Sequence, residues 1–113
     1  MMTMDESAYR QRVDEVFRRI DAAFENVDPD LAESDYAQGT LVVTFRQAHK
    51  LILSPQTPLR QIWMAFRDRA WHFALAETSG QPETWTADRG QGMELLTLIT
   101  ELARENASVQ VAF

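Results

Sequence analysis

The chain has 113 residues, 45% of them apolar, with a formal net charge of −6 and no cysteine. This length suits one hydrophobic core and not two, so we expect residues 1–113 to form a single domain. The negative charge argues against a nucleic acid or an anionic membrane as the main partner, because both would repel it. Without cysteine, disulfides, thiolate zinc sites, cysteine-ligated clusters and a cysteine nucleophile are excluded. A metal would have to bind through oxygen or histidine.

Apolar spacing predicts a first helix from about Met4 to Val27. The apolar residues recur three and four positions apart: Tyr9, Val13, Val16, Phe17, Ile20, Phe24 and Val27. The opposite side follows the same period with Asp14, Arg18, Asp21, Glu25 and Asp28. Proline at position 29 ends the helix, because the residue before a proline avoids the helical conformation. The N-terminal residues Met1 to Tyr9 include Asp5 and Glu6 and no apolar run, unlike a secretory signal, so we expect a cytoplasmic protein.

The most informative segment lies between Ile20 and Phe45, where six carboxylates occur without a lysine or arginine. It leads from the last turns of the first helix to the entrance of a strand, so the acids should form a ridge on one edge of the domain. We call this set the acidic ridge: Asp21, Glu25, Asp28, Asp30, Glu33 and Asp35. Carboxylates are hard oxygen donors, so such a ridge can hold hard cations or a basic partner. The alternative interpretation is a solvated helix face without a ligand.

Four apolar runs after the ridge predict antiparallel strands at Leu41–Phe45, Leu51–Leu53, Ile62–Phe66 and Trp71–Leu75. Turns at Gly80 to Pro82 and at Asp88-Arg89-Gly90 would flank a short strand around Trp85, and a second helix would run from about Gly92 to Asn106. Two helices that flank a run of hairpins can pack on the same side of a sheet. We therefore expect an α+β fold, a two-layer α/β sandwich with the N- and C-terminal helices on one face of an antiparallel sheet.

Side chains alternate along a strand, so the two central runs also predict which residues face away from the helices. In the third run, Ile62, Met64 and Phe66 would face the core and Trp63 would face outward. In the fourth, His72 would lie opposite to the buried side and next to Trp63. A Trp–His surface suggests contact with a partner, although a partly buried strand tryptophan and a surface histidine remain the simpler alternatives.

The charges are segregated along the chain. Residues 46–72 contain five cations against Asp68 alone: Arg46, Lys50, Arg60, Arg67 and Arg69. With the acids gathered before them, the molecule should be electrically dipolar.

These motifs resemble the frataxin family, and in particular its bacterial CyaY-type members. The resemblance covers about Glu6 to Asn106 and includes the acidic end of the first helix. It also rests on Gly39-Thr40-Leu41-Val42-Val43-Thr44-Phe45, Pro58-Leu59-Arg60-Gln61-Ile62-Trp63, Trp71-His72-Phe73, and Trp85 followed by Asp88-Arg89-Gly90. It implies the same sandwich fold that the strand and helix pattern predicts.

The resemblance further implies a protein that binds Fe2+ and Fe3+ weakly and regulates iron-sulfur cluster assembly. The matching metal residues are those of the acidic ridge. Docking on a cysteine desulfurase and on the scaffold protein is implied for Asp14, Asp28, Asp30, Glu33 and Trp63. His72 joins these docking residues because the strand alternation places it beside Trp63. A monomer is expected, with iron-driven oligomers as a further state.

Several positions depart from the family pattern. Ala22 and Asn26 stand where relatives often carry further acids, so the ridge is thinner, and Ser54 replaces a usual asparagine. The segment Arg67-Asp68-Arg69-Ala70 replaces a loop that is commonly glycine-rich.

Catalysis is not the interpretation that the sequence favours. There is no glycine-rich phosphate loop and no His-x-x-x-His pair, and two scattered histidines give no local support for a serine triad. Two alternatives to an iron-binding regulator stay open: a ferroxidase or iron-detoxifying protein, and an acidic interaction module without a metal. The apolar tail from Ser108 to Phe113 should lie back between the helices. The resemblance implies that this tail affects stability, so removing Val109 to Phe113 should lower the melting temperature.

Overall fold

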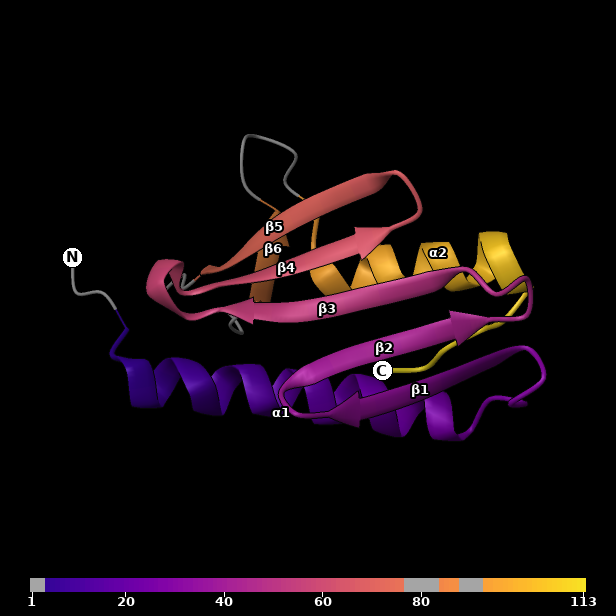
Figure 1. The fold of residues 1–113 in the computed structure, drawn as a ribbon, viewed down its shortest axis with the longest axis horizontal. Coiled ribbons are helices and arrows are strands. Elements are labelled where there is room, and N and C mark those ends of the chain that lie inside the picture. Colours follow the sequence, from indigo (N-terminus) through magenta and orange to yellow (C-terminus); the bar gives the residue numbers. More distant parts are fainter. Residues whose placement is uncertain (1–3, 77–83, 88–92) are drawn as a thin grey trace.

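The computed structural model of the chain describes residues 4–76, 84–87 and 93–113. In this part of the chain, six antiparallel strands form one sheet in sequence order, as Figure 1 shows. The elements are α1 (Glu6–Glu25), β1 (Ala32–Ala37), β2 (Thr40–Phe45), β3 (Lys50–Gln56), a 3-10 turn η1 (Thr57–Leu59), β4 (Gln61–Phe66), β5 (Arg69–Ala76), β6 (Thr84–Ala87) and α2 (Leu95–Ala107).

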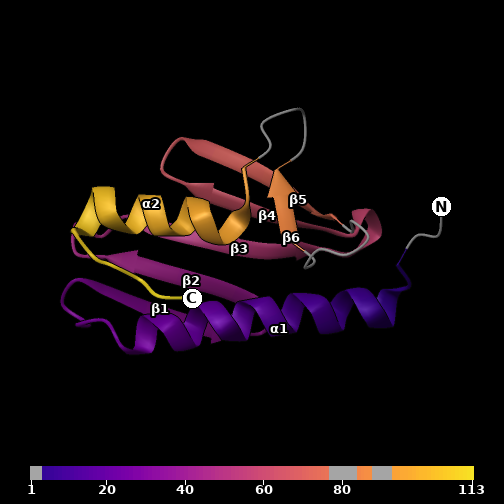
Figure 2. The same ribbon diagram turned by 180° about the vertical axis from the view of Figure 1, so that it is seen from behind.

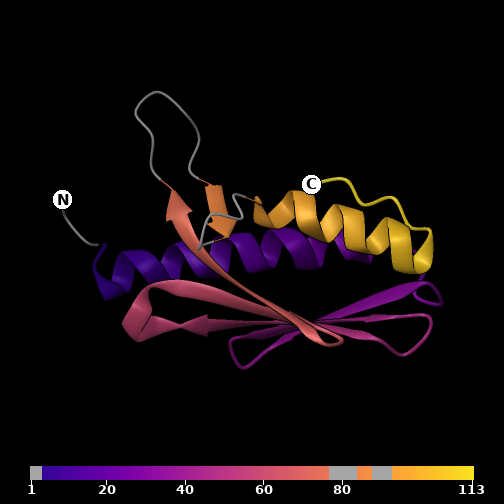
Figure 3. The ribbon, with the colours of Figure 1, turned by 90° about the horizontal axis from the view of Figure 1, so that it is seen from above.

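Both helices lie on the same side of this sheet, and the other side is uncovered, which is plain when the molecule is seen from above (Figure 3). The expected two-layer α/β sandwich is therefore confirmed. The uncovered side of the sheet is called the open face below. No helix in the described part of the chain is long and apolar enough to cross a membrane.

Helix α1 is shorter than the predicted Met4–Val27 at both ends. Asp5 is its N-cap, and the Asp5 side chain accepts a hydrogen bond of 2.7 Å from the Ala8 N–H. The helix ends at Glu25, and the next residue, Asn26, is its C-cap. The predicted apolar stripe is largely buried, with Tyr9, Val13, Phe17, Ile20 and Phe24 in the core. Val16 and Val27 are partly buried against it.

Helix α2 begins later than predicted, at Leu95 instead of about Gly92. Glu94 caps it by accepting hydrogen bonds from the N–H groups of Leu96 and Thr97. Met93 cannot belong to the helix, because its carbonyl accepts a 2.7 Å hydrogen bond from the Ala87 N–H. Gly92 itself lies outside the described residues, as do the predicted turns at Gly80 to Pro82 and Asp88 to Gly90.

The four apolar runs are confirmed as strands β2 to β5, and Trp85 lies in the short strand β6. The sequence interpretation missed β1 as a strand of its own. This strand contains no apolar run, because its inward positions are Ala32, Ser34 and Tyr36. Only Ala32 is fully buried, and the strand is held by its pairing with β2 from Ala32–Phe45 to Ala37–Thr40.

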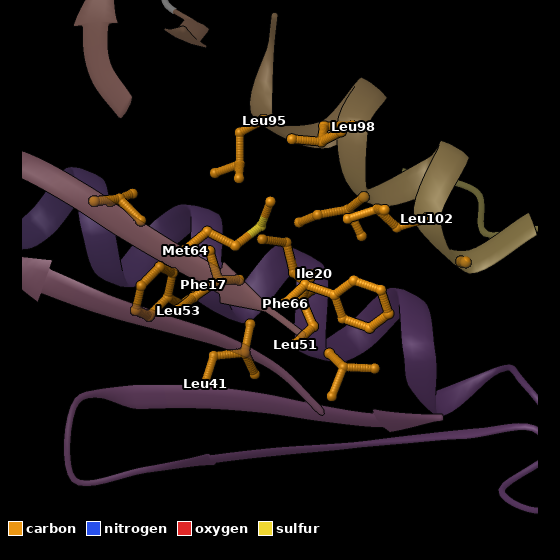
Figure 4. Packing of buried hydrophobic residues seen from close by; sticks show 14 of the residues in the cluster. Phe17, Ile20, Leu41, Leu51, Leu53, Met64, Phe66, Leu95, Leu98 and Leu102 are labelled. Atoms are coloured by element: carbon orange, nitrogen blue, oxygen red, sulfur yellow. The ribbon is translucent and has the colours of Figure 1, made fainter. Parts of the chain in front are cut away.

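The core lies between the sheet and the helices (Figure 4). Met64 and Phe66 from β4 meet Phe17 and Ile20 from α1, while leucines of β2, β3 and α2 fill the remaining space. The C-terminal tail runs back between the two helices (Figure 2). Val109 of this tail is only 4% exposed, and Phe113 packs against the core, so the predicted course of the tail is confirmed.

Candidate functional site

The acidic ridge occupies the edge of the molecule where α1 and β1 meet. Asp21 and Glu25 come from the last turns of α1, and Asp28 and Asp30 from the connection that follows it. Glu33 and Asp35 are exposed on β1, alternating with Ala32, Ser34 and Tyr36, which face the helices. The ridge therefore continues from the helix around the sheet edge onto the open face.

Two hydrogen bonds fasten α1 to β1 below the ridge. The Ser34 hydroxyl donates to Asp21 Oδ1 at 2.5 Å, and the Tyr36 hydroxyl donates to Asp14 Oδ1 at 2.7 Å. Sequence reasoning missed both Ser34 and Tyr36. The signal that could have found them is the alternation of small or polar inward residues with acids from position 32 to 37. These bonds fix the helix relative to the edge strand.

Asp14 is engaged at both carboxylate oxygens, because Arg18 Nε donates to its Oδ2 at 2.8 Å. The Arg18 hydrogen bond, followed by the Tyr36 hydrogen bond, lowers the pKa of Asp14 below its ordinary value. Burial, followed by the hydrogen bond to Asp14, raises the pKa of Tyr36 to about 12. Asp14, predicted as a docking residue, thus also has a local role in joining α1 to β1.

The connection between α1 and β1 is shaped by Asp28. Its Oδ1 accepts a 2.9 Å hydrogen bond from the Asp30 N–H, and its carbonyl accepts one of 2.9 Å from Leu31. An aspartate that binds the backbone two residues ahead forms a turn without help from other elements. The turn leaves the Asp28 and Asp30 side chains exposed, where a partner can reach them.

Cations border the acidic ridge in space although none occurs within it in sequence. Arg18 approaches from α1 through its bond to Asp14. Arg46, from the turn after β2, lines one shallow hollow together with Asp30 and Glu33. The Arg46 N–H also donates to the Leu31 carbonyl at 2.9 Å. The ridge is therefore less negative at its two ends than the sequence window suggests.

The six predicted metal residues do not converge on one point. Among the residues that the structure describes, no group of three or more His, Asp or Glu side chains could hold a metal ion together. Asp21 already accepts the Ser34 hydroxyl, and the other five carry exposed carboxylates. The geometry supplies separate oxygen donors on a surface and no preformed cage.

Trp63 and His72 are adjacent on the open face, as the strand alternation predicts. They are paired across β4 and β5, and their rings stack with centroids 4.3 Å apart and planes 14° apart. Trp63 is half-buried, and its Nε1–H donates to Gln61 Oε1 at 2.9 Å. The Trp63 ring is thus held by His72 and Gln61, with part of its surface exposed.

An apolar row leads from the acidic ridge to a position next to this pair. Asp35 pairs with Val42, Val42 with Ile52, and Ile52 with Ala65 in successive strands. Ala65 lies two residues from Trp63 on the same face of β4. Ile52 is 39% exposed, which is unusual for a large apolar side chain. Sequence reasoning missed Val42 and Ile52, although the alternation in Leu51-Ile52-Leu53 was a usable signal.

The comparisons with known proteins agree with this architecture. Residues 2–109 match the model of the frataxin-like domain. The chain is 34% identical over 110 residues to the iron-sulfur cluster assembly protein CyaY of Pseudomonas aeruginosa, with 97% of each chain covered. It is 33% identical to the protein of the same name from Aeromonas salmonicida, covering 97% of this chain and 99% of that one.

Solved structures give the same result. The frataxin of Psychromonas ingrahamii superposes with a TM-score of 0.82 at 26% identity, with 96% of each chain covered. A trimeric frataxin from the yeast Saccharomyces cerevisiae, in a ferrous complex, superposes with a TM-score of 0.65 at 19% identity, covering 96% of this chain and 91% of that one. At that identity the yeast protein shows a common fold alone. The chain belongs to the frataxin-like family.

Proposed function

We propose that the chain acts in iron-sulfur cluster assembly as a binding protein that docks on a cysteine desulfurase and on the scaffold protein. The names of its bacterial relatives support the general role. The observation that carries the docking proposal is the continuous surface from the acidic ridge, through Val42 and Ile52, to the Trp63–His72 pair.

The two parts of this surface would contribute differently to binding. Exposed carboxylates such as Asp28, Asp30 and Glu33 attract a basic partner and set its orientation. Salt weakens this attraction by screening the charges. Trp63 offers a rigid aromatic surface beside Ile52, of the kind that supplies most of the affinity at protein interfaces. A partner that covers the edge and the open face would touch both.

A binding assay with the cognate desulfurase tests this proposal. The variant with Asp28→Asn, Asp30→Asn and Glu33→Gln should bind more weakly and change desulfurase turnover less than the wild type. A matched control removes three charges outside the ridge by Glu15→Gln, Glu101→Gln and Glu105→Gln, and should behave like the wild type. Equal binding by the ridge variant and the wild type would mean that the ridge is not the docking surface.

We also propose that the acidic ridge binds iron weakly, as cargo or as a signal of iron supply. Its exposed oxygen donors suit Fe2+ at low affinity and Fe3+ more strongly. The yeast frataxin in a ferrous complex makes Fe2+ the first ion to examine. We expect a monomer without iron, and oligomers if iron bridges ridges of different copies.

Calorimetry and backbone amide NMR with Fe2+ under anaerobic conditions test the iron proposal. Paramagnetic broadening should be confined to ridge residues and should be reduced by Asp21→Asn with Glu25→Gln. If the heat and the broadening do not exceed those of a general acidic protein, the chain is a metal-independent acidic module.

We assign the chain a binding role without catalysis of its own, and the competing class is a ferroxidase. Two irons held by neighbouring carboxylates would be oxidised by oxygen faster than free Fe2+. Oxygen consumption above the buffer rate, abolished by Asp21→Asn with Glu25→Gln, would favour the ferroxidase. If the wild-type protein leaves oxygen consumption at the buffer rate, the binding role is favoured.

A further inference from the structure

A second charged surface lies beside the acidic ridge and takes no part in the function proposed above. The turns β2–β3 and β4–β5 lie at the same end of the sheet as the connection from α1 to β1 (Figure 1). Four exposed cations lie in or next to these two turns, and we call them the basic end: Arg46, Lys50, Arg67 and Arg69. In the sequence, these residues appear only as part of an excess of positive charge within residues 46–72.

The register of the strands places this cluster next to the ridge. Glu33 pairs with Thr44, and Thr44 pairs with Lys50, so Glu33 and Lys50 lie in one row of the open face. Because Leu51 pairs with Phe66, Lys50 and Arg67 are neighbours where strands β3 and β4 meet the turns. One end of the molecule therefore changes from acidic at β1 to basic at β3 and β4.

In the part of the chain that the structure describes, the cations of the basic end lack ion pairs of the kind that Arg10 and Arg18 make. On α1, Arg10 lies 3.2 Å from Glu6 and Arg18 lies 2.8 Å from Asp14. Within the described residues, no side chain of the basic end has an ion pair with a carboxylate. Their charges are thus available to an external group.

The tight turn between β4 and β5 shapes the backbone at one of these cations. Arg67 has φ +57°, in the left-handed region that favours glycine or asparagine over a long side chain. Gln38, Ala48, Arg60 and Ser108 have the same conformation, so it reflects the geometry of the turn. Beside it, the guanidinium of Arg69 lies 4.6 Å above the centre of the Trp71 ring, which holds this charge in place.

We propose that the basic end docks against an acidic surface of the same protein partner that receives the acidic ridge. The proposal rests on the proposed function, since it adds a second contact to that docking. The acidic ridge and the basic end present charges of opposite sign side by side. A partner with a basic patch beside an acidic patch can pair with both in only one orientation.

A protein surface fits the basic end better than a nucleic acid does. The chain carries −6 overall, Asp68 lies inside the cluster, and Asp28 and Asp30 lie on the same end of the molecule. A long polyanion would meet all of these acids, whereas a compact group of carboxylates would meet the cations alone.

The test removes two charges of the basic end by Lys50→Gln with Arg67→Asn. Arg69 is left in place because its loss would also remove the contact with Trp71. At low salt, Kd for the desulfurase should rise by roughly fivefold for each charge removed, the upper range for an exposed ion pair. The melting temperature should stay level or rise, because asparagine accepts the left-handed conformation better than arginine.

Two controls separate charge from structure. Arg10→Gln with Arg19→Gln removes the same charge elsewhere and should leave Kd unchanged. Lys50→Arg with Arg67→Lys keeps the charge and should retain wild-type affinity, whichever way its melting temperature moves.

The outcomes distinguish this proposal from the one on which it rests. If the ridge variant binds weakly while Lys50→Gln with Arg67→Asn binds like the wild type, the ridge docks and the basic end does not. If neither variant is weakened, both proposals fail. If a short DNA duplex binds the wild type and does not bind the basic-end variant, the ligand of the basic end is a nucleic acid. The proposal of an acidic protein surface is then refuted.

Discussion

The C-terminal tail offers a stability prediction whose size follows from the structure. Val109 is 4% exposed, and its N–H donates to the Ala103 carbonyl at 3.3 Å. Val109→Ala keeps this backbone bond and removes two buried methyl groups, each worth about 0.8 kcal/mol. The free energy of unfolding should therefore fall by roughly 1.5 kcal/mol. For 113 residues, the unfolding entropy is about 0.24 kcal/mol/K, so the melting temperature should drop by roughly 6 °C.

Differential scanning calorimetry measures both quantities on the purified protein. Gln110→Ala is the matched control, because Gln110 is the next residue in the tail and is exposed, and it should melt within a degree or so of the wild type. If Val109→Ala has the same melting temperature as the wild type, the tail is frayed in solution and its packing between the helices is refuted.

The other predictions concern the tail, the α1–β1 junction and the open face. Deleting Val109 to Phe113 should lower the melting temperature, and an unchanged value would contradict the packed tail. Tyr36→Phe should also lower it, and should raise the pKa of Asp14 in an NMR titration, because the carboxylate loses a hydrogen-bond donor. Trp63→Ala should weaken desulfurase binding with little change in stability, and equal affinity would remove the open face from the interface.

The pH dependence of stability follows from the same junction. Because the folded-state pKa of Asp14 is lowered, its contribution is complete above the ordinary value of 3.8 and is lost as the pH falls through the lowered value. The raised pKa of Tyr36 affects stability at high pH. Its contribution is complete below the ordinary value of 10.0 and is lost as the pH rises toward about 12. When the melting temperature is plotted against pH, the Tyr36→Phe variant should lose less stability than the wild type at both low and high pH. The same pH profile for variant and wild type would contradict this.

The sequence was sufficient to predict most of the fold, because the main elements carry strong periodic patterns. The stripe from Tyr9 to Phe24 identifies α1, and the alternation around Trp63 and His72 places both rings on the open face. Strand β1 was missed because its inward side has only one fully buried residue, Ala32. Its place at the edge depends on pairing with β2 and on contacts with α1, which local sequence does not contain.

The candidate site was predictable only in part, because distances along the chain and in space differ. The acidic ridge was recognised as a window free of cations, yet Arg46 lies beside Asp30 and Glu33 once β2 pairs with β1. The anchoring of Asp14 by Tyr36 spans 22 residues and could not be read from spacing. Likewise, the basic end exists only because two turns of the sheet meet at one end.

An NMR footprint of the desulfurase on the isotope-labelled protein tests the docking account most directly. If the ridge and the open face bind the desulfurase, amide signals should weaken in the part of the acidic ridge from Asp28 to Asp35 and across the open face around Ile52 and Trp63. The outward side of α2, including Thr97 and Arg104, should remain unaffected. A footprint on α2 and the tail, with unchanged signals at the ridge, would contradict it.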